Sequence, residues 1–531
     1  MNTSKIKCLV LVILLVMGRI TQPLANPWGN SMSSVSAKKS LIAAACILGT
    51  FHIYKRYIEP QFKIKNIITE SMNYEEAPEV LGKALADAVA NNPFVKENGF
   101  YWGVSSSCSQ NESESQKSTV SKEYIDNSDK KETWLALGNG CLSDQYWKND
   151  NEKVQALNCN MYRFSIDWSR IQPAEKSINI HELERYAAQC QDLMARGITP
   201  MVCFHHYADP IWFIEKGGFE KEENIQYFVD FCGLVTEKLS EKGVTYWLVM
   251  NQPLAYINKG YLEGSQPPFK KATITAQAIL TGRAMELADK VRVNIFTAHV
   301  EVSKAIKNLN QNHQIGASHQ ITPMRAGRYW SIDPVAAHII DQFYNQKFLN
   351  FAKKEKKYLD FIALSSYSPC RFTLFDIGIS PFKFKWASMN AFWNSEVQGY
   401  ETDDEKRIID PQGLFDSVKR IAENVGKEMP IIIIESGVDV QDEKKRINYF
   451  NQTMSAIVET LKAGYHLKGF CVWTLMDNYE WGKGYNAHFG LYTRRVFDDS
   501  GALIDGELKD GGKHYKNIIA SFNTARNSPT K

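Results

Sequence analysis

The sequence has little net charge and no paired cysteines. Its 62 basic and 59 acidic residues leave a formal net charge of +3 over 531 residues. This balance argues against a nucleic-acid partner, which requires a clustered basic face. The ten cysteines are scattered singly, without a C-x-x-C pair. We therefore expect buried free thiols, and neither a disulfide framework nor a thiolate metal site.

Glycine-rich phosphate loops and paired metal-binding histidines are also missing. No G-x-G-x-x-G segment follows a predicted strand, which argues against a dinucleotide cofactor. The segment HELER at 181–185 lacks the second histidine of a zinc metalloprotease helix. His205 and His206 are neighbours on a predicted strand, so their side chains point to opposite faces. The sequence indicates neither a metal nor an organic cofactor.

Two apolar runs near the N-terminus are each too short to span a bilayer, which takes about 20 residues. The first, 8–17, follows Lys5 and Lys7, as in a signal peptide, so residues 1–25 are a signal peptide or a first hydrophobic segment. The second, 41–54, has basic residues on both sides, and 38–58 is a candidate membrane segment. These runs predict secretion or membrane association. The alternative is a helix packed on the following domain, and a cytoplasmic location stays open.

The chain from residue 97 alternates between short β-rich apolar segments and longer segments of helical periodicity. Residues 59–96 precede it as a linker with a charged helical stretch at about 70–90. The strand candidates are GFYWGVSS, NMYRFSI, TPMVCFHH, TYWLVMN, QIGASHQI, FIALSSYS, PIIIIES and LKGFCVWTL. Such alternation implies parallel strands, and PIIIIES is apolar throughout, as in a strand covered on both faces. In 181–197, Leu183, Tyr186 and Cys190 fall on one helical face. Residues 97–525 are therefore predicted to form an α/β fold, a (β/α)₈ TIM barrel; an open doubly wound sheet is the runner-up.

The C-terminal ends of the predicted strands carry an unusual mixture of polar and aromatic side chains. In such a barrel these ends carry the chemistry. They present Gln110, Arg163, His206, Asn251, Gln252, Tyr367, Glu435 and Trp473. Polyol recognition needs this mixture, because hydroxyl groups require donors and acceptors and the apolar face of a sugar ring requires an aromatic platform.

Seven stretches, in order along residues 97–525, resemble the motifs of glycoside hydrolase family 1. They are FYWGVSSSCSQNE, YRFSIDWSRIQP, HHYADPIWFIEKGGF, WLVMNQP with GYLEGSQPP, DFIALSSYS, IIIIESG and FCVWTLMDNYEWGKGYNAHFGL. The resemblance implies retaining hydrolysis of β-glycosides by two carboxyl groups about 5–5.5 Å apart. One attacks the anomeric carbon, and the other protonates the leaving oxygen and then deprotonates water.

The same resemblance implies a role for each matching residue. Glu435 is the nucleophile, Arg163 pairs with it and Tyr367 hydrogen-bonds it. The implied sugar ligands are Gln110, His206, Asn251, Trp473, Glu480 and Trp481. Family members that act on 6-phosphosugars lack a carboxylate at the position of Glu480. The implied substrate is therefore an unphosphorylated β-glycoside or oligosaccharide, with glucose, fucose and galactose types open.

Gln252 stands in MNQP where the family has its acid/base glutamate. An amide cannot act as a proton donor to the leaving group or as a base toward water. That assistance typically contributes 10²–10⁴-fold, about 3–5 kcal/mol of barrier. Plant myrosinases resemble this chain in having glutamine there; their thioglucosides need no proton, and ascorbate supplies the base. The family's W-D-x-F segment after the first strand is also missing, and a polar stretch at 113–131 replaces it.

Three hypotheses follow from this pattern. The first is a β-glucosidase-like hydrolase, transglycosidase or thioglucosidase with a reduced or specialised acid/base step. The second is a glycan-binding pseudoenzyme, and the third is a scaffold that retains only the barrel. The presence of both Glu435 and Arg163 favours the first, because binding alone does not require the pair.

Overall fold

The computed structural model describes residues 66–68, 75–97, 99–128, 137–271, 285–326, 337–338, 340–372, 402–404, 407 and 409–528. All of them belong to one compact unit, residues 57–531. The predicted signal peptide and membrane segment lie outside the described residues, so secretion and membrane association stay predictions. Among the helices of the described ranges, none has both the length and the apolar composition that a bilayer crossing requires.

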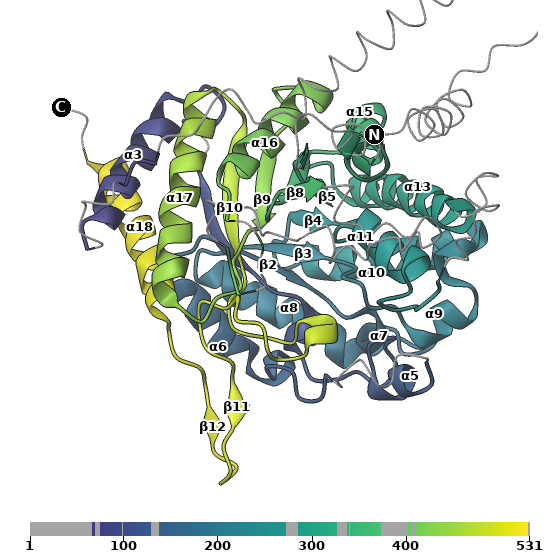
Figure 1. The fold of residues 1–531 in the computed structure, drawn as a ribbon. Helices are drawn as coiled ribbons and strands as arrows, with labels where there is room; N and C mark the ends of the chain where they lie inside the picture. Colours follow the sequence, from purple (N-terminus) through teal and green to yellow (C-terminus); the bar gives the residue numbers. More distant parts are fainter. Residues whose placement is uncertain are drawn as a thin grey trace, which may run out of the picture. The chain divides into compact units, whose positions relative to one another are not determined.

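Eight parallel strands close into a barrel, which confirms the predicted fold over the open sheet (Figure 1). They are β1 (Tyr101–Ser105), β2 (Met161–Ser165), β3 (Thr199–Cys203), β4 (Tyr246–Leu248), β5 (Gln314–Gln320), β7 (Phe361–Ser365), β9 (Ile431–Glu435) and β10 (Leu467–Trp473). Each of the eight predicted segments contains one of these strands. The barrel closes because β1 pairs with β2 on one side and with β10 on the other.

The apolar run of β9 is explained by burial on both faces. Ile432 and Ile434 pack inside the barrel in a cluster with Cys203 and Cys471. Ile431 and Ile433 belong instead to the larger core between the barrel and its helices. Alternate residues of a strand face opposite sides, so a strand enclosed on both sides needs apolar residues throughout. The eight cysteines in the described ranges are all free and buried, as expected.

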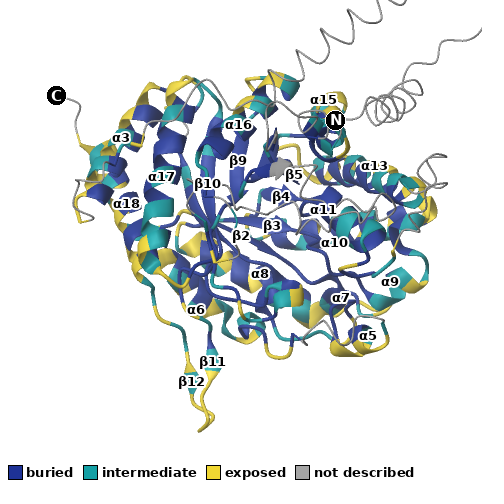
Figure 2. Cartoon of the chain, viewed as in Figure 1, coloured by how far each residue is buried: buried dark blue, intermediate teal, exposed yellow. Residues whose placement is uncertain are grey.

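Helices cover the outside of the barrel and bury their apolar faces against it (Figure 2). They include α6 (Ser143–Ala156), α8 (Ile180–Ala195), α10 (Ile225–Ser240), α13 (Glu286–Leu309), α15 (Lys347–Lys354), α16 (Gln412–Val425), α17 (Glu443–Lys462) and α18 (Asp510–Asn527). In α8, Leu183, Tyr186 and Cys190 are buried on one face, as the periodicity predicted. The side chain of Asn179 caps this helix by accepting from the backbone N–H of Glu182.

The helix before the barrel, α3 (Ala77–Asn91), is packed and is not a free linker. Leu81, Leu85 and Val89 are buried in the main core. At Gly82 an added Cβ would lie 2.5 Å from the Cβ of Ser521 in α18. Glycine therefore permits the close approach of α3 and α18. Within 59–96, α3 lies where the charged helical stretch is expected, and this helix shares the core of the barrel unit.

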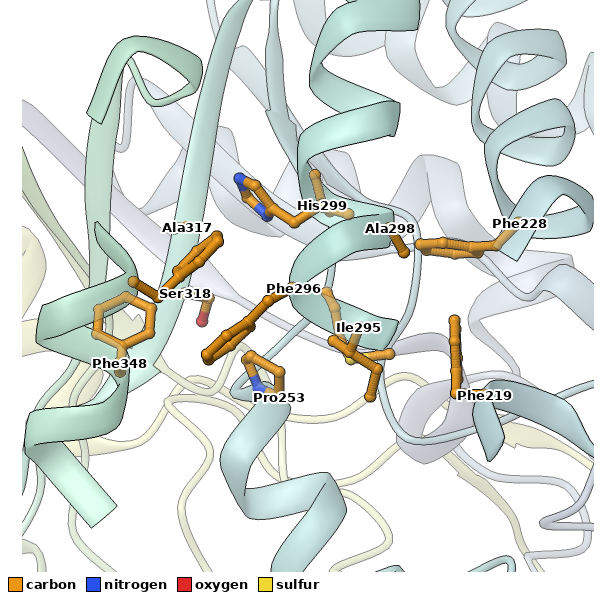
Figure 3. Close-up of a pocket in the computed structure, with 13 residues that line it drawn as sticks. Phe219, Phe228, Pro253, Ile295, Phe296, Ala298, His299, Ala317, Ser318 and Phe348 are labelled. Carbon is orange, nitrogen blue, oxygen red and sulfur yellow. The ribbon is translucent and has the colours of Figure 1, made fainter. Parts of the chain in front are cut away.

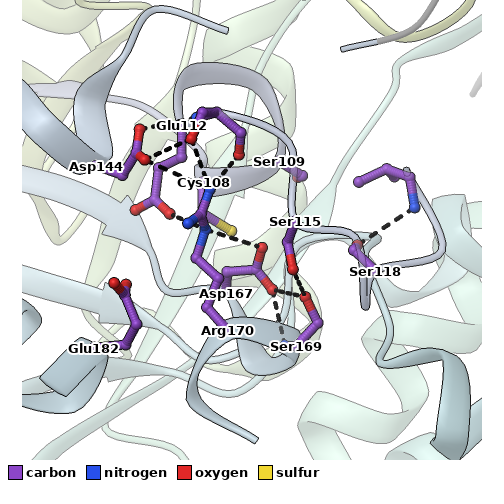
Figure 4. Close-up of polar contacts among 12 residues, drawn as sticks. Cys108, Ser109, Glu112, Ser115, Ser118, Asp144, Asp167, Ser169, Arg170 and Glu182 are labelled. Atoms are coloured by element: carbon purple, nitrogen blue, oxygen red, sulfur yellow. Dashed lines mark hydrogen bonds and ion pairs between the residues drawn. The ribbon is translucent and has the colours of Figure 1, made fainter. Parts of the chain in front are cut away.

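The short helix α4 (Cys108–Asn111) follows β1 and carries Gln110. A buried ionic cluster around Glu112 and Arg170 fixes this segment (Figure 4). Glu112 lies 3.1 Å from the Nε of Arg170 and 3.1 Å from an Nη of Arg185. The hydroxyl of Tyr186 donates to the same carboxylate at 2.8 Å. A buried carboxylate needs such partners, and together they hold α4 at the barrel mouth.

Candidate active site

A cavity of about 540 Å³ lies at the C-terminal ends of the barrel strands. Nine predicted site residues line it: Gln110, His206, Asn251, Gln252, Tyr367, Glu435, Trp473, Glu480 and Trp481. The tenth, Arg163, is fully buried and hydrogen-bonds two of these residues. The fold thus brings together all ten predicted residues around a space of the size that small-molecule sites have.

Glu435 is the last residue of β9, and both of its carboxylate oxygens are hydrogen-bonded. Oε1 accepts from Nη1 of Arg163 at 2.8 Å. Oε2 accepts from the amide nitrogen of Gln252 at 3.0 Å and from the hydroxyl of Tyr367 at 3.2 Å. Burial raises the pKa of Glu435, and the positive charge of Arg163 opposes that shift. The three donors fix the orientation of a carboxylate that faces the cavity.

Arg163 also orders the neighbouring polar wall. Its Nη2 donates to Oδ1 of Asn251 at 2.7 Å and lies 3.4 Å from Nδ1 of His206. The amide nitrogen of Asn251 lies 3.2 Å from Nε2 of the same imidazole. Burial, with Arg163 nearby, holds the pKa of His206 well below its usual value, so the ring is neutral at pH 7. This wall offers fixed amide and imidazole groups, which suit hydroxyl groups better than a charged ligand.

Gln252 follows β4 in a left-handed backbone conformation, with φ of 38°, at the start of α11 (Pro253–Ile257). Its backbone N–H donates to Oγ of Ser318 at 3.2 Å, and its Oε1 accepts from the hydroxyl of Tyr207 at 3.1 Å. Figure 3 shows apolar side chains, Phe296 and Phe348 among them, gathered beside Pro253 and Ser318. The amide therefore has a fixed direction, with oxygen on Tyr207 and nitrogen on Glu435.

Gln110 and Glu480 form a second polar pair in the cavity. The amide nitrogen of Gln110 donates to Oε2 of Glu480 and to the backbone oxygen of Tyr479, both at 2.9 Å. Oγ of Ser107 donates to the amide oxygen of Gln110 at 2.8 Å. Burial raises the pKa of Glu480 to about 7, although nearby lysine and arginine side chains oppose the shift. Near neutral pH this carboxyl therefore exchanges between a charged acceptor and a neutral donor.

Two tryptophans stack near His206 at the cavity wall. The rings of Trp473 and His206 have centroids 5.8 Å apart and planes 21° apart. Trp481 lies at 6.2 Å from the same imidazole with planes 16° apart. The indoles give this cavity an aromatic surface beside its amide and carboxyl groups, which is the mixture that polyol recognition requires.

Further lining residues were not singled out from the sequence, notably Tyr207, Lys259 and Arg407. Tyr207 directly follows His206 at the end of the β3 segment, so its position at a strand end could have indicated it. Lys259 and Arg407 lie in connecting segments, where no strand-end rule applies. Only the tertiary structure reveals that these two cations face the same cavity as Glu435.

Comparisons with known proteins agree with this architecture. The family model described as "Glycosyl hydrolase family 1" matches residues 92–354 and 345–524. The chain is 26% identical over 414 residues to "Beta-glucosidase A" of Acetivibrio thermocellus, covering 70% of this chain and 86% of that protein. It is 25% identical over 407 residues to "6-phospho-beta-galactosidase" of Clostridium acetobutylicum, covering 66% and 82%. The solved "beta-glycosidase from Pyrococcus horikoshii" is similar with a TM-score of 0.66 and 26% identity, covering 80% of this chain and 94% of that one.

Proposed function

The chain belongs to glycosyl hydrolase family 1, and from that premise we propose that it is a retaining, β-glucosidase-like glycosidase that forms a covalent glycosyl-enzyme on Glu435. Its substrate is an unphosphorylated β-glycoside, because Glu480 places in the sugar shell a carboxyl group that repels a sugar phosphate when it is ionised. The relatives' names support a glycoside substrate, although the Clostridium acetobutylicum protein is named for a phosphorylated one.

The contacts of Glu435 carry this proposal. A carboxylate held by Arg163 at 2.8 Å and by Tyr367 at 3.2 Å has a fixed orientation, and it also lines the cavity. An attacking oxygen must be fixed within reach of the anomeric carbon, and fixed donors achieve this. A carboxylate that served only to stabilise the barrel would not need to face the cavity.

The proposed mechanism differs from the usual one at Gln252, where the acid/base carboxyl group is missing. In the first step an oxygen of Glu435 forms a bond to the anomeric carbon, and the bond to the aglycone breaks with its electron pair on the leaving atom. Gln252 supplies no proton, so an aglycone that is stable as an anion leaves readily and an alkyl alcohol leaves slowly. In the second step the oxygen of water, or of another hydroxyl compound, forms a bond to the anomeric carbon and gives its proton to an external base. The bond between that carbon and Glu435 breaks, and its electron pair returns to the carboxylate. A thioglucoside fits the first step for the same reason.

Covalent labelling tests the proposal directly. The full chain is incubated with 2,4-dinitrophenyl 2-deoxy-2-fluoro-β-glucoside, whose leaving group needs no acid, and its intact mass is measured. We expect a mass increase of one fluoroglycosyl group that maps to Glu435 and is absent from Glu435→Gln. The full chain is required because α3 packs against α18. If a folded protein is not labelled by the gluco, galacto or fuco reagent, the proposal fails.

A glycan-binding pseudoenzyme is the second candidate. It is favoured by the hydrogen bond that Gln252 donates to Oε2 of Glu435, because this amide can neither protonate a leaving group nor deprotonate water. Failure of labelling together with measurable binding of a thio-linked phenyl glucoside would select this candidate.

A further inference from the structure

Three cations line the catalytic cavity, namely Lys259, Arg407 and Lys483, and Lys259 and Arg407 are the two that lie outside the segment of Glu480 and Trp481. Lys259 belongs to η3 (Asn258–Leu262), which directly follows α11, and Arg407 precedes α16. The two residues come from distant segments of the chain. Their convergence on one cavity therefore results from the tertiary fold, and both cations act electrostatically on Glu480 in that cavity.

Only part of the guanidinium group of Arg407 is hydrogen-bonded within the described residues. Its Nε donates to Oδ2 of Asp403 at 2.7 Å, and its guanidinium lies 4.9 Å from the ring centroid of Phe489. Its Nη2 is buried and has no hydrogen-bond partner in the part of the chain that the structure describes. A buried charged donor without an acceptor costs free energy, about 1–3 kcal/mol or more. Because this nitrogen is buried, a ligand in the cavity would meet the exposed part of the Arg407 side chain, which lines the cavity.

Lys259 is held in place but is not neutralised at contact distance. Its backbone oxygen accepts from the N–H groups of Ser265 and Gln266, which fixes the segment around it. Within the described ranges no carboxylate lies within ion-pair distance of its ammonium group. Burial lowers the pKa of Lys259, while Glu263 and Glu480 act on it from further away and oppose that shift. An anionic ligand would compensate the burial of the ammonium group.

We propose that Lys259 and Arg407 bind an anionic oxygen group, a carboxylate or a sulfate or phosphate ester, on the aglycone of the substrate. The inference rests on the proposed function, because it names the substrate class of that same site. The aglycone is the part concerned because the sugar shell contains the carboxyl of Glu480, which disfavours an anion on the sugar itself. The positive charges of Lys259 and Arg407 would also stabilise negative charge on an aglycone that leaves without a proton from Gln252.

Binding without turnover tests this inference. Calorimetry on full-length Glu435→Gln protein compares phenyl and 4-carboxyphenyl 1-thio-β-glucoside, and no ligand is consumed because the nucleophile is absent. We expect the carboxylated ligand to bind at least about tenfold more tightly at low salt, with the preference reduced at high salt. Adding Lys259→Met should remove most of the preference, and Lys259→Arg should retain it. Lys354→Met is the matched control, because that side chain is 81% exposed and lies outside the cavity.

The outcomes separate this inference from the proposed function. Equal binding of the two ligands by a protein that melts like the parent would overturn the inference, whatever the labelling of Glu435 shows. A preference for phenyl 1-thio-β-glucuronide would overturn it as well, because the anion would then belong to the sugar. No binding of any of the three ligands by the folded protein would overturn the inference, whereas the proposed function would still be decided by labelling with the gluco, galacto and fuco reagents. Preference for the aglycone carboxylate without labelling of the parent would support the anion site and refute the glycosidase.

Discussion

The amide nitrogen of Gln252 donates a hydrogen bond of 3.0 Å to Oε2 of Glu435. Two carboxyl groups at this separation would share a proton, and the pKa of one of them would rise. With glutamine there, Glu435 has a neutral donor as its neighbour, and the orientation of that amide is fixed by the hydroxyl of Tyr207 at 3.1 Å. The hydrogen bond therefore stabilises the ionised form of Glu435. The amide has no acidic proton to give, although a poor leaving group needs one to depart.

Restoring a carboxyl group at this position should restore general acid–base assistance. We expect Gln252→Glu to raise the kcat for hydrolysis of an unactivated alkyl β-glucoside at least about tenfold, since such assistance typically contributes 10²–10⁴-fold. The pH profile should gain a basic limb as the new acid loses its proton. Product release from the alkyl glucoside, followed across pH 4–9, measures both effects.

The matched control for this change is Gln320→Glu. Gln320 also lines the cavity, and its amide contacts Thr322 and not Glu435. A new carboxyl group there should bring no comparable gain. If Gln252→Glu folds as the parent does and gains nothing, the acid/base interpretation of position 252 is wrong.

Glu480 should make the stability of the protein depend on pH. Burial raises its folded-state pKa from 4.5 to about 7. The folded state then keeps a proton that the unfolded state has lost, so this group's contribution to stability is complete below pH 4.5 and declines as pH rises to about 7. Glutamine does not ionise, so Glu480→Gln should remove the part of the fall in the free energy of unfolding that comes from this group. Urea unfolding at pH 5 and pH 7.5 should show a smaller loss of the free energy of unfolding in the variant than in the parent. An identical loss in both proteins would contradict the raised pKa.

Packing of α3 against α18 should tolerate no larger side chain at Gly82. A Cβ there would lie 2.6 Å from the backbone nitrogen of Phe522 as well as close to Ser521. We expect Gly82→Leu to lower the free energy of unfolding by about 1–3 kcal/mol or more, the usual range for overpacking. Gly233→Ala in α10 is the control, because an added Cβ meets nothing within 4 Å. That change should be neutral or stabilising by up to about 1 kcal/mol. Equal urea midpoints for Gly82→Leu and the parent would show that α3 is not part of the cooperative unit.

The sequence by itself determined the barrel and most of its site. Eight apolar segments separated by helical periodicity fix a parallel α/β arrangement, because each strand and each helix face must bury its own apolar residues. The strand-end rule then selects residues such as Arg163 and Glu435 before any contact is known, since parallel strands place their C-terminal ends on one side of the sheet. The helical part of residues 59–96 was also evident, but its packing was not, because a short amphipathic helix does not specify the surface that it covers.

Only the tertiary structure decided how the side chains are partnered. The direction of the Gln252 amide depends on Tyr207 and Glu435, which lie 45 and 183 residues away in the chain. The raised pKa of Glu480 depends on burial, which no local pattern measures. Lys259 and Arg407 sit in connecting segments with no periodic signal, and their common cavity arises because the closed barrel directs its loops to one end. Hydrogen bonds and desolvation depend on which groups are neighbours in space, and such neighbours can be far apart in the sequence. They could therefore be assigned only from the closed barrel.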